Sequence, residues 1–121
     1  MADRILFITW GANVAGREER GLEVFNEAVG LYGRMQQEGR IEGFDVALMT
    51  PSGAGIDGYM CLKGSAEQLN AVKEDQDYLR VMTDASLIVK NLCVCDGYAN
   101  EGIAPQMAMY QEAIGRVPQM A

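Results

Sequence analysis

The stretch Arg4–Trp10, with the sequence RILFITW, and the stretch Leu87–Cys95, with the sequence LIVKNLCVC, decide which fold this chain can adopt. A strand with one face in water alternates apolar and polar residues, whereas a nearly continuous apolar run indicates a strand that is covered on both faces. Both stretches are of the second kind. The rest of the chain has patterns for about three helices, too few to cover both faces of a sheet. The two strands therefore predict self-association.

A first helix is predicted to run to about residue 38, with Asn13 as its candidate cap and Glu18 and Glu19 in its first turn. Its apolar residues recur at three- and four-residue spacing: Leu22, Phe25, Val29, Tyr32 and Met35. The segment Gly43–Thr50 is typical of a second strand and Tyr59–Lys63 of a third. The turn-rich residues 51–58 join these strands as a hairpin. Within that loop, residues 53–58 match the G-x-G-x-x-G dinucleotide fingerprint, but a strand follows instead of a helix, so we interpret the motif as a hairpin loop.

Ser65 and Gln68 form a capping box, which predicts that a second helix opens there. It is expected to continue without a break to about Met82, with one stripe at Leu69, Val72, Gln76 and Leu79. A fourth strand is predicted over about residues 87–96. A last helix is predicted from near Asn100, with an apolar stripe at spacings of 4, 3, 4 and 3: Ile103, Met107, Tyr110, Ile114 and Val117. At about two heptads this stripe is too short for a zipper on its own, so we expect it to pack on the sheet or across a dimer contact.

The order of these elements is β-α-β-β-α-β-α. The first six form the split β-α-β arrangement called ferredoxin-like. The sequence therefore predicts an α+β fold, with a four-stranded antiparallel sheet and an extra C-terminal helix. The usual strand order places the first and third strands at the centre and the second and fourth at the edges. Residues 1–121 are expected to form a single ferredoxin-like domain.

Composition excludes several classes of function. The net charge is −7, and the sequence has no cluster of Lys or Arg that would attract phosphate groups despite this charge. Nucleic acid and anionic membrane surfaces are therefore disfavoured as partners. No apolar run approaches the roughly 20 residues that span a bilayer, and the N-terminal run lacks the pattern of a signal peptide. Three cysteines do not make a disulfide framework, so a cytoplasmic protein is expected.

The absence of histidine is the most restrictive count. Ser–His and Cys–His nucleophile pairs are excluded within one chain, and the commonest metal ligand is missing. We therefore expect no metal and no cofactor, and no catalytic residue can be assigned. Cys61, Cys93 and Cys95 are interpreted as small buried residues, with redox chemistry or a metal site shared between chains as the alternative.

Four residues are candidates for a ligand pocket: Trp10, Tyr59, Asn91 and Tyr98. Trp10 and Tyr98 lie at the ends of predicted strands, and Asn91 interrupts an otherwise apolar one. Aromatic side chains with a polar tip beside a buried amide are typical of small-molecule pockets, although cores and subunit interfaces contain them too.

Several of these features together resemble the dimeric α/β-barrel superfamily: the first strand with Trp10, the hairpin, the opening of the second helix at Gly64-Ser65-x-Glu67-Gln68-Leu69, and the strand that ends in Asp96-Gly97-Tyr98. The resemblance implies a dimer in which two sheets pair through the faces that their helices leave uncovered. Known activities in the superfamily include cofactor-free monooxygenases, lactone isomerases, heme-degrading enzymes and dye-decolourising peroxidases. Those activities commonly rely on histidine, so the resemblance implies an architecture here and no catalytic set.

The sequence as a whole predicts a cytoplasmic homodimer whose cleft, between sheet and helices, binds a small apolar or aromatic molecule. The alternative is a cofactor-free monooxygenase-like enzyme that acts on an electron-rich aromatic substrate, with Trp10, Tyr59 and Asn91 orienting that substrate. A purely structural or regulatory interaction partner is a third interpretation.

Overall fold

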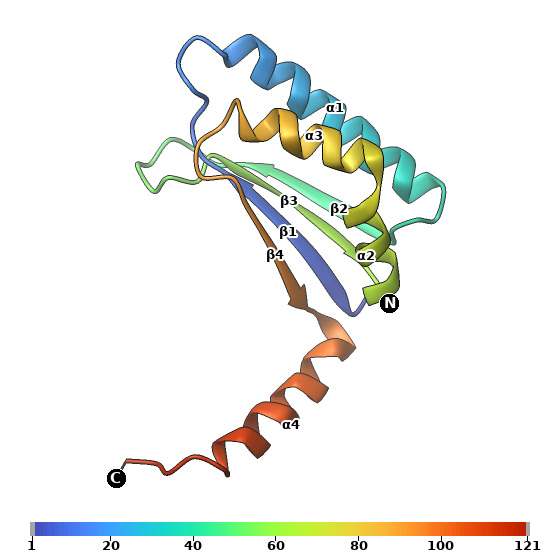
Figure 1. The fold of residues 1–121 in the computed structure, drawn as a ribbon, viewed down its shortest axis with the longest axis vertical. Coiled ribbons are helices and arrows are strands. Elements are labelled where there is room, and N and C mark those ends of the chain that lie inside the picture. Colours follow the sequence, from blue (N-terminus) through green and yellow to red (C-terminus); the bar gives the residue numbers. More distant parts are fainter. Residues whose placement is uncertain (1, 121) are drawn as a thin grey trace.

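A computed structural model describes residues 2–120 and arranges them as one antiparallel sheet under a layer of helices (Figure 1). The elements are, in chain order, β1 (Arg4–Trp10), α1 (Glu18–Gln37), β2 (Gly43–Leu48), β3 (Gly58–Gly64), α2 (Ala66–Glu74), α3 (Gln76–Ser86), β4 (Cys93–Tyr98), the short 3-10 helix η1 (Asn100–Gly102) and α4 (Ile103–Ile114). The strand order is β2-β3-β1-β4. This confirms the predicted α+β ferredoxin-like fold, with β1 and β3 at the centre.

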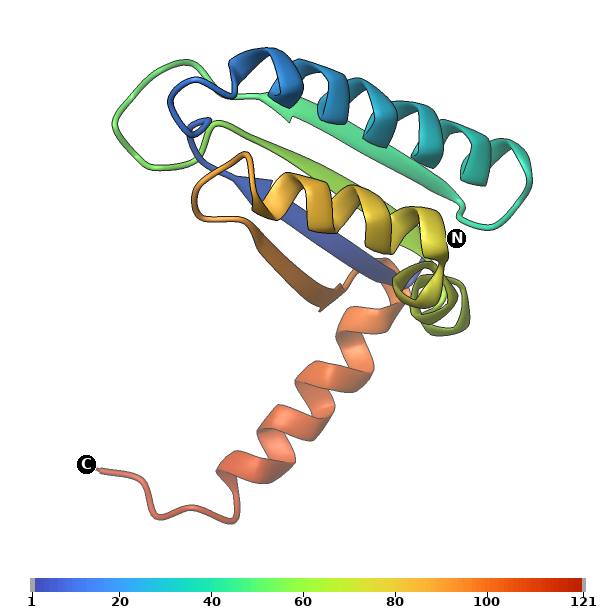
Figure 2. The same cartoon turned by 45° about the horizontal axis from the view of Figure 1, so that its top comes forward.

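One face of the sheet is buried by α1 and α3, which run side by side across it (Figure 2). Leu6 and Ile8 of β1 point to this face and pair across the strands with Leu62 and Met60 of β3. All four side chains are buried. The helices contribute the other half of the core through residues such as Leu31, Tyr32, Met35, Tyr78 and Val81. The spacing in α1 predicts the helix correctly but only part of its buried face, because Leu22 is 67% exposed whereas Val24 and Leu31, outside the predicted set, are buried.

The opposite face of the sheet has no helix over it, and we call it the open face. Because side chains alternate along a strand, Ile5, Phe7 and Thr9 of β1 point to this side. The strand register assigns the remaining nine of its twelve positions: Gly43, Asp45 and Ala47 of β2, Tyr59, Cys61 and Lys63 of β3, and Cys93, Cys95 and Gly97 of β4. Strand β1 is thus apolar on both faces, but within a single chain only one of these faces is covered.

The predicted second helix is two helices, which corrects the expectation of one unbroken element. The chain leaves helical geometry at Asp75, whose ψ is 135°, and its carboxylate accepts hydrogen bonds from the amides of Asp77 and Tyr78 at 2.9 and 3.0 Å. Arg40 also donates to this carboxylate, at 2.6 Å. A capping side chain therefore ends α2 and starts α3. The change of direction leaves Leu79 43% exposed, although the sequence pattern placed it on the apolar stripe.

The fourth strand begins at Cys93, so its predicted start at residue 87 is wrong. Residues 87–92 form a connection that pairs with the segment after β1, through hydrogen bonds from the Gly11 amide to the Lys90 carbonyl and from the Lys90 amide to the Ala12 carbonyl. Ile88 is buried there. Asn91 has a φ of 56°, which is left-handed backbone and not strand geometry. Leu87 is 63% exposed, so the apolar run in this part of the chain marks neither a strand nor a fully buried loop.

The C-terminal helix forms as predicted but does not pack on the sheet. Helix α4 contains no buried residue and leaves the end of β4 on the side of the sheet opposite α1 and α3 (Figure 1). Of the two predicted settings for its apolar stripe, the structure excludes contact with the sheet of the same chain. None of the helices within residues 2–120 combines the length and the apolar character needed to cross a bilayer.

The stability of the fold depends on pH through the ionisation of the Asp75 carboxyl group. Partial burial alone would raise the pKa of this carboxyl group, but hydrogen bonds from Arg40 and from the Tyr78 and Asp77 amides outweigh it and lower the pKa below its ordinary value of 3.8. A carboxyl with a lowered folded-state pKa stabilises the fold above that value, and the stabilisation is lost as the pH falls through the folded pKa.

We expect Asp75→Asn to reduce the free energy of unfolding at pH 7 by about 0.5–1 kcal/mol, because asparagine still caps the helix but loses the charge. The difference from wild type should persist to about pH 5 and shrink as the pH falls through the folded-state pKa of Asp75, which lies below 3.8, as measured by urea unfolding. Asp77→Asn removes an exposed carboxylate of the same helix and serves as the control. Equal losses in the two variants at pH 7 would contradict the role of Asp75.

Candidate functional site

A cavity of about 530 Å³ lies between the sheet and the two helices that cover it. Its floor is the end of β1, with Ile8 and Trp10, and its walls come from the facing sides of α1 and α3. The helices contribute mainly apolar residues to the lining, because these residues belong to the helix sides that face the sheet. They are Leu22, Val24, Phe25 and Ala28 on α1, and Val81, Met82 and Ala85 on α3. Helix periodicity in the sequence indicates these inward faces but does not distinguish a filled core from a cavity.

Trp10 is held at the floor of the cavity by two neighbours. Its ring meets the Phe25 ring edge to face, with centroids 6.1 Å apart and an interplanar angle of 67°. On the adjacent strand, a Cβ atom added to Gly58 would lie 2.5 Å from Cζ2 of Trp10. Only glycine leaves room for the indole at this point of the sheet.

Loops close one end of the cavity. The β2–β3 hairpin loop contributes Met49, Pro51 and Asp57 to the lining, and the connection before β4 contributes Val89 and Leu92. The hairpin loop is fixed at the end of β1 by hydrogen bonds from the Met49 amide to the Asp57 carbonyl, at 2.8 Å, and from the Asp57 amide to the Trp10 carbonyl, at 2.7 Å. The loop that resembled a dinucleotide fingerprint is therefore a hairpin loop, as predicted, and it borders the cavity.

The lining residues carry almost no charge. Asp57 is the only one of them with a formal charge, and Asn13 and Asn26 add two amides. The Tyr32 hydroxyl is buried, and that burial raises the pKa of Tyr32, so the phenol stays neutral. No lysine or arginine lines the cavity, which leaves an anionic ligand without a counter-charge. Among residues 2–120, no cluster of three or more Cys, Asp or Glu side chains is placed to hold a metal ion.

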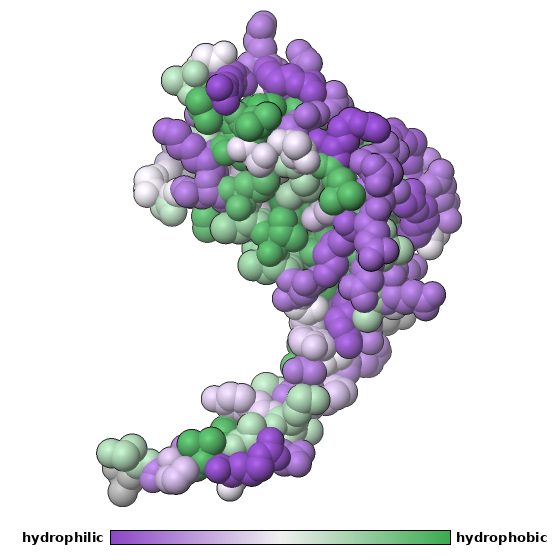
Figure 3. All heavy atoms as spheres, in the orientation of Figure 1, coloured by the Kyte–Doolittle hydropathy of each residue, from purple (hydrophilic) through white to green (hydrophobic). Residues whose placement is uncertain are grey.

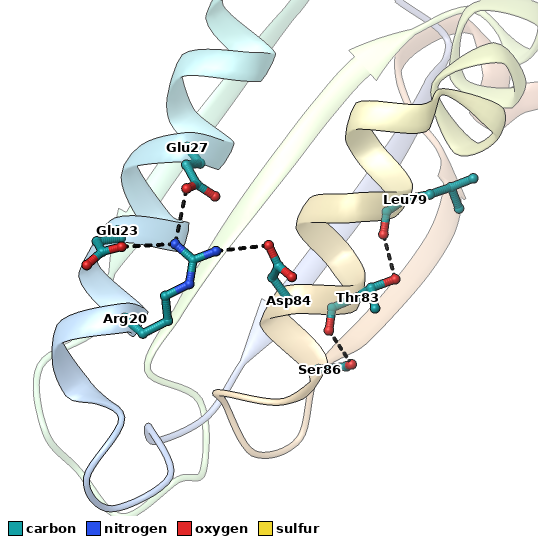
Figure 4. Close-up of polar contacts among 7 residues, drawn as sticks. All are labelled: Arg20, Glu23, Glu27, Leu79, Thr83, Asp84 and Ser86. Carbon is teal, nitrogen blue, oxygen red and sulfur yellow. Dashed lines mark hydrogen bonds and ion pairs between the residues drawn. The ribbon is translucent and has the colours of Figure 1, made fainter.

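Arg20 links the two helices over the cavity (Figure 4). From α1 it donates to Asp84 of α3 at 3.0 Å, and it also contacts Glu23 at 3.0 Å and Glu27 at 3.1 Å on its own helix. The hydrogen bond to Glu27, followed by that to Glu23, raises the pKa of Arg20 above its already high ordinary value. The guanidinium is partly exposed, so its ion pairs contribute little to stability and chiefly set how α1 and α3 lie relative to each other.

The structure does not bring the four predicted pocket residues together. Trp10 lines the cavity, and the Asn91 amide lies beside Gly11 and Gly55 at the same end of the sheet. Tyr59 points to the open face, where its ring lies 5.2 Å from that of Phe7.

Tyr98 lies at the far end of β4, with the guanidinium of Arg4 stacked 4.3 Å over its ring. The prediction missed the residues from α1 and α3 that form the walls. Leu22, Phe25 and Tyr32 were found by their spacing on the first helix but were not connected with a pocket, because spacing alone does not distinguish a filled core from a cavity.

The three cysteines all lie on the open face, with β1 between Cys61 and the other two. Cys61 is buried, as predicted, and this burial raises the pKa of its thiol despite the opposing effect of Lys63. Cys93 and Cys95 are exposed in the single chain, so the expectation that they are buried residues is wrong for one isolated copy. Both side chains belong to the edge strand of a face that nothing in the chain covers.

Comparison with solved structures identifies the class of fold. The chain is similar to a dimeric ferredoxin-like protein of unknown function from Jannaschia, with a TM-score of 0.63 and 11% identity, over 79% of this chain and 99% of that one. It is also similar to a dimeric protein of unknown function from Bacteroides fragilis, with a TM-score of 0.59 and 10% identity, over 79% and 96%. A third match is the hydroxynitrile lyase from Passiflora edulis, with a TM-score of 0.63 and 10% identity, over 84% and 97%.

These matches confirm the predicted ferredoxin-like fold. At 10–11% identity the likeness extends to the fold and not to an activity. Neither a family model nor a curated protein matches the sequence.

Gly58→Ala should displace Trp10 from the floor of the cavity, because the new methyl group would meet both the indole and the Ala47 carbonyl. We expect a loss of about 1–3 kcal/mol in the free energy of unfolding and a red shift in the fluorescence of Trp10, the single tryptophan. Gly43→Ala, on β2 of the same sheet, adds its methyl group to open space and is the matched control. Unchanged fluorescence in Gly58→Ala would contradict the close packing at Trp10.

Proposed function

We propose that this protein is a cytoplasmic homodimer that binds a small, neutral, apolar or aromatic molecule in the cavity between the sheet and helices α1 and α3. The observation that carries the proposal is the lining of that cavity, which is apolar on its floor and walls and has its few polar groups, Asn13, Asn26 and Asp57, on exposed residues. Ligand sites in proteins commonly have this composition, with many apolar residues and a small number of polar ones that fix orientation.

The size and the side chains of the cavity support a ligand with the dimensions of an aromatic metabolite. Its volume of about 530 Å³ falls in the roughly 300–1,000 Å³ range of small-molecule sites. Three methionines line it: Met49, Met60 and Met82. Thioether side chains are flexible and make favourable contacts with aromatic rings, so they accommodate ligands of somewhat different shape.

The proposed homodimer rests on the open face. Ile5 and Phe7 lie at its centre on β1, and the exposed Cys93 and Cys95 lie along its edge on β4. Two such faces packed about 10 Å apart would give β1 its second layer of cover. The matched proteins from Jannaschia and Bacteroides fragilis are described as dimeric, which supports the same assembly here.

A neutral fluorescent probe, N-phenyl-1-naphthylamine, tests the cavity directly. We expect it to bind the wild type with a rise in probe emission and a change in Trp10 fluorescence, since Trp10 lines the cavity. Ala85→Phe places a ring inside the cavity and should weaken binding at least about tenfold, which corresponds to about 1.4 kcal/mol.

Thr83→Phe adds the same ring to an exposed position of the same helix, outside the cavity, and should leave probe affinity unchanged. A circular dichroism spectrum and a melting temperature for both variants show that each has folded. Equal affinity in Ala85→Phe and wild type would show that the probe binds elsewhere and would count against a ligand site in this cavity.

Phe7→Arg tests the homodimer, because it places a charge at the centre of the open face. Burying an unpaired charge between two sheets is costly, so we expect the variant to sediment as a monomer at concentrations where the wild type sediments as a dimer. Gln36→Arg adds the same charge at an exposed position of α1 and should leave the dimer intact. A dimer in both variants would contradict association through the open face.

One observation favours the monooxygenase-like alternative: Trp10 and Asn91, two of the three residues it uses, lie at the same end of the sheet. Tyr59 points to the other face and is outside this arrangement. Oxygen consumption with a hydroquinone, lost in Asn91→Ala while probe binding is retained, would support an enzyme. Oxygen consumption no higher than without protein would leave ligand binding as the function.

A further inference from the structure

Helix α4 is rich in apolar side chains, although it is exposed to solvent. Its apolar stripe consists of Ile103, Met107, Tyr110 and Ile114, and between 38% and 63% of each of these residues is exposed to solvent. The spacings of 4, 3 and 4 residues place the four on one side of the helix. Isolated helices of about 12 residues are marginal in water, so α4, with 12 residues and no buried one, needs a surface to pack on.

The side of the molecule on which α4 lies indicates which surface this is. Helices α1 and α3 lie above the sheet, and α4 projects below it, on the side of the open face (Figure 1). The body and α4 enclose a hollow, and hydrophobic side chains gather on the body over β4 and beside α3, next to that hollow (Figure 3). The open face and α4 therefore present one continuous concave surface.

The extent of the open face supports the same conclusion. It has twelve positions, two of them glycines, whereas a stable interface uses roughly 20–30 residues from each partner. The 12 residues of α4 raise the available surface to that size. The open face alone is small for a stable dimer, and the open face with α4 is not.

Charge favours a second copy over an acidic or a basic partner. Within α4 the only charged residue is Glu112, and it forms an ion pair at 3.2 Å with Arg116, just beyond the helix. A chain with a net charge of −7 repels its own copy wherever carboxylates meet, and α4 presents almost none. An apolar, nearly uncharged arm can meet an identical molecule without that repulsion.

We propose that α4 is an arm that packs its apolar stripe on the second copy of the chain, so that each subunit of the dimer is held both by the open face and by the partner's helix. The proposal rests on the homodimer proposed above. It adds a second contact, in which α4 of each subunit packs on the other subunit. Two identical arms related by a two-fold axis make the same contact twice, which closes the assembly at two copies.

Tyr110→Glu in the full-length chain tests the arm, and Ala108→Glu, off the stripe and exposed on the same helix, is its matched control. Removing an interface anchor typically raises a dissociation constant by roughly 30-fold or more, and we expect that change for Tyr110→Glu in sedimentation equilibrium. Ala108→Glu should keep the dissociation constant of the wild type within about threefold.

Hydrogen exchange on the same variants separates docking of α4 from a general loss of structure. We expect the amides of residues 103–114 to be protected in the wild type and in Ala108→Glu, and to exchange rapidly in Tyr110→Glu while the amides of β1 stay protected. If Tyr110→Glu retains both the dissociation constant and the protection of α4, the arm does not pack on the partner, and the homodimer itself is unaffected. A monomeric wild type would instead overturn the proposed homodimer, and the arm with it.

Discussion

The apolar character of β1 on both of its faces is the constraint on which the rest of the structure depends. On one side, Leu6 and Ile8 are buried under α1 and α3 and form the core. On the other side, Ile5 and Phe7 have no covering element in the chain. The helix-side packing creates the cavity, because α1 and α3 meet the sheet above Trp10 without filling the space between them. The uncovered side is the surface through which we propose that a second copy binds.

Much of the fold follows from local signals that have a physical cause. The capping box of Ser65 and Gln68 is present, with both of its hydrogen bonds, at 3.1 and 2.8 Å. Turn residues locate the hairpin loop, and Gly53 and Gly55 adopt the positive φ that this loop requires. The break at Asp75 could not be predicted in the same way, because a single carboxylate ends one helix and caps the next with no glycine or proline nearby. Apolarity misplaced the start of β4, since the connection 87–92 is rich in apolar residues without being a strand, and only Ile88 of it is buried.

The candidate site was less predictable than the fold because it depends on how closely two helices pack on the sheet, which the sequence of each helix does not show. Trp10 could be found from its position at a strand end, whereas Asn91 was predicted inside a strand and instead lies exposed in the connection before β4, with left-handed backbone. Tyr59 and Tyr98 have the residue type of a pocket but point to the open face and to the far end of β4. Strand alternation fixes the face of a residue only when the register is known, and one sequence does not supply the register.

The proposed sheet-on-sheet association would place the open face, the exposed thiols of β4 and the projecting helix α4 in one interface. The most direct test is the mass of the wild-type protein in solution at micromolar concentration, by light scattering after gel filtration. A homodimer gives about 26.4 kDa, twice the 13.2 kDa of one chain. A mass of 13.2 kDa would contradict the association, because β1 would then expose an apolar face to water in the native protein.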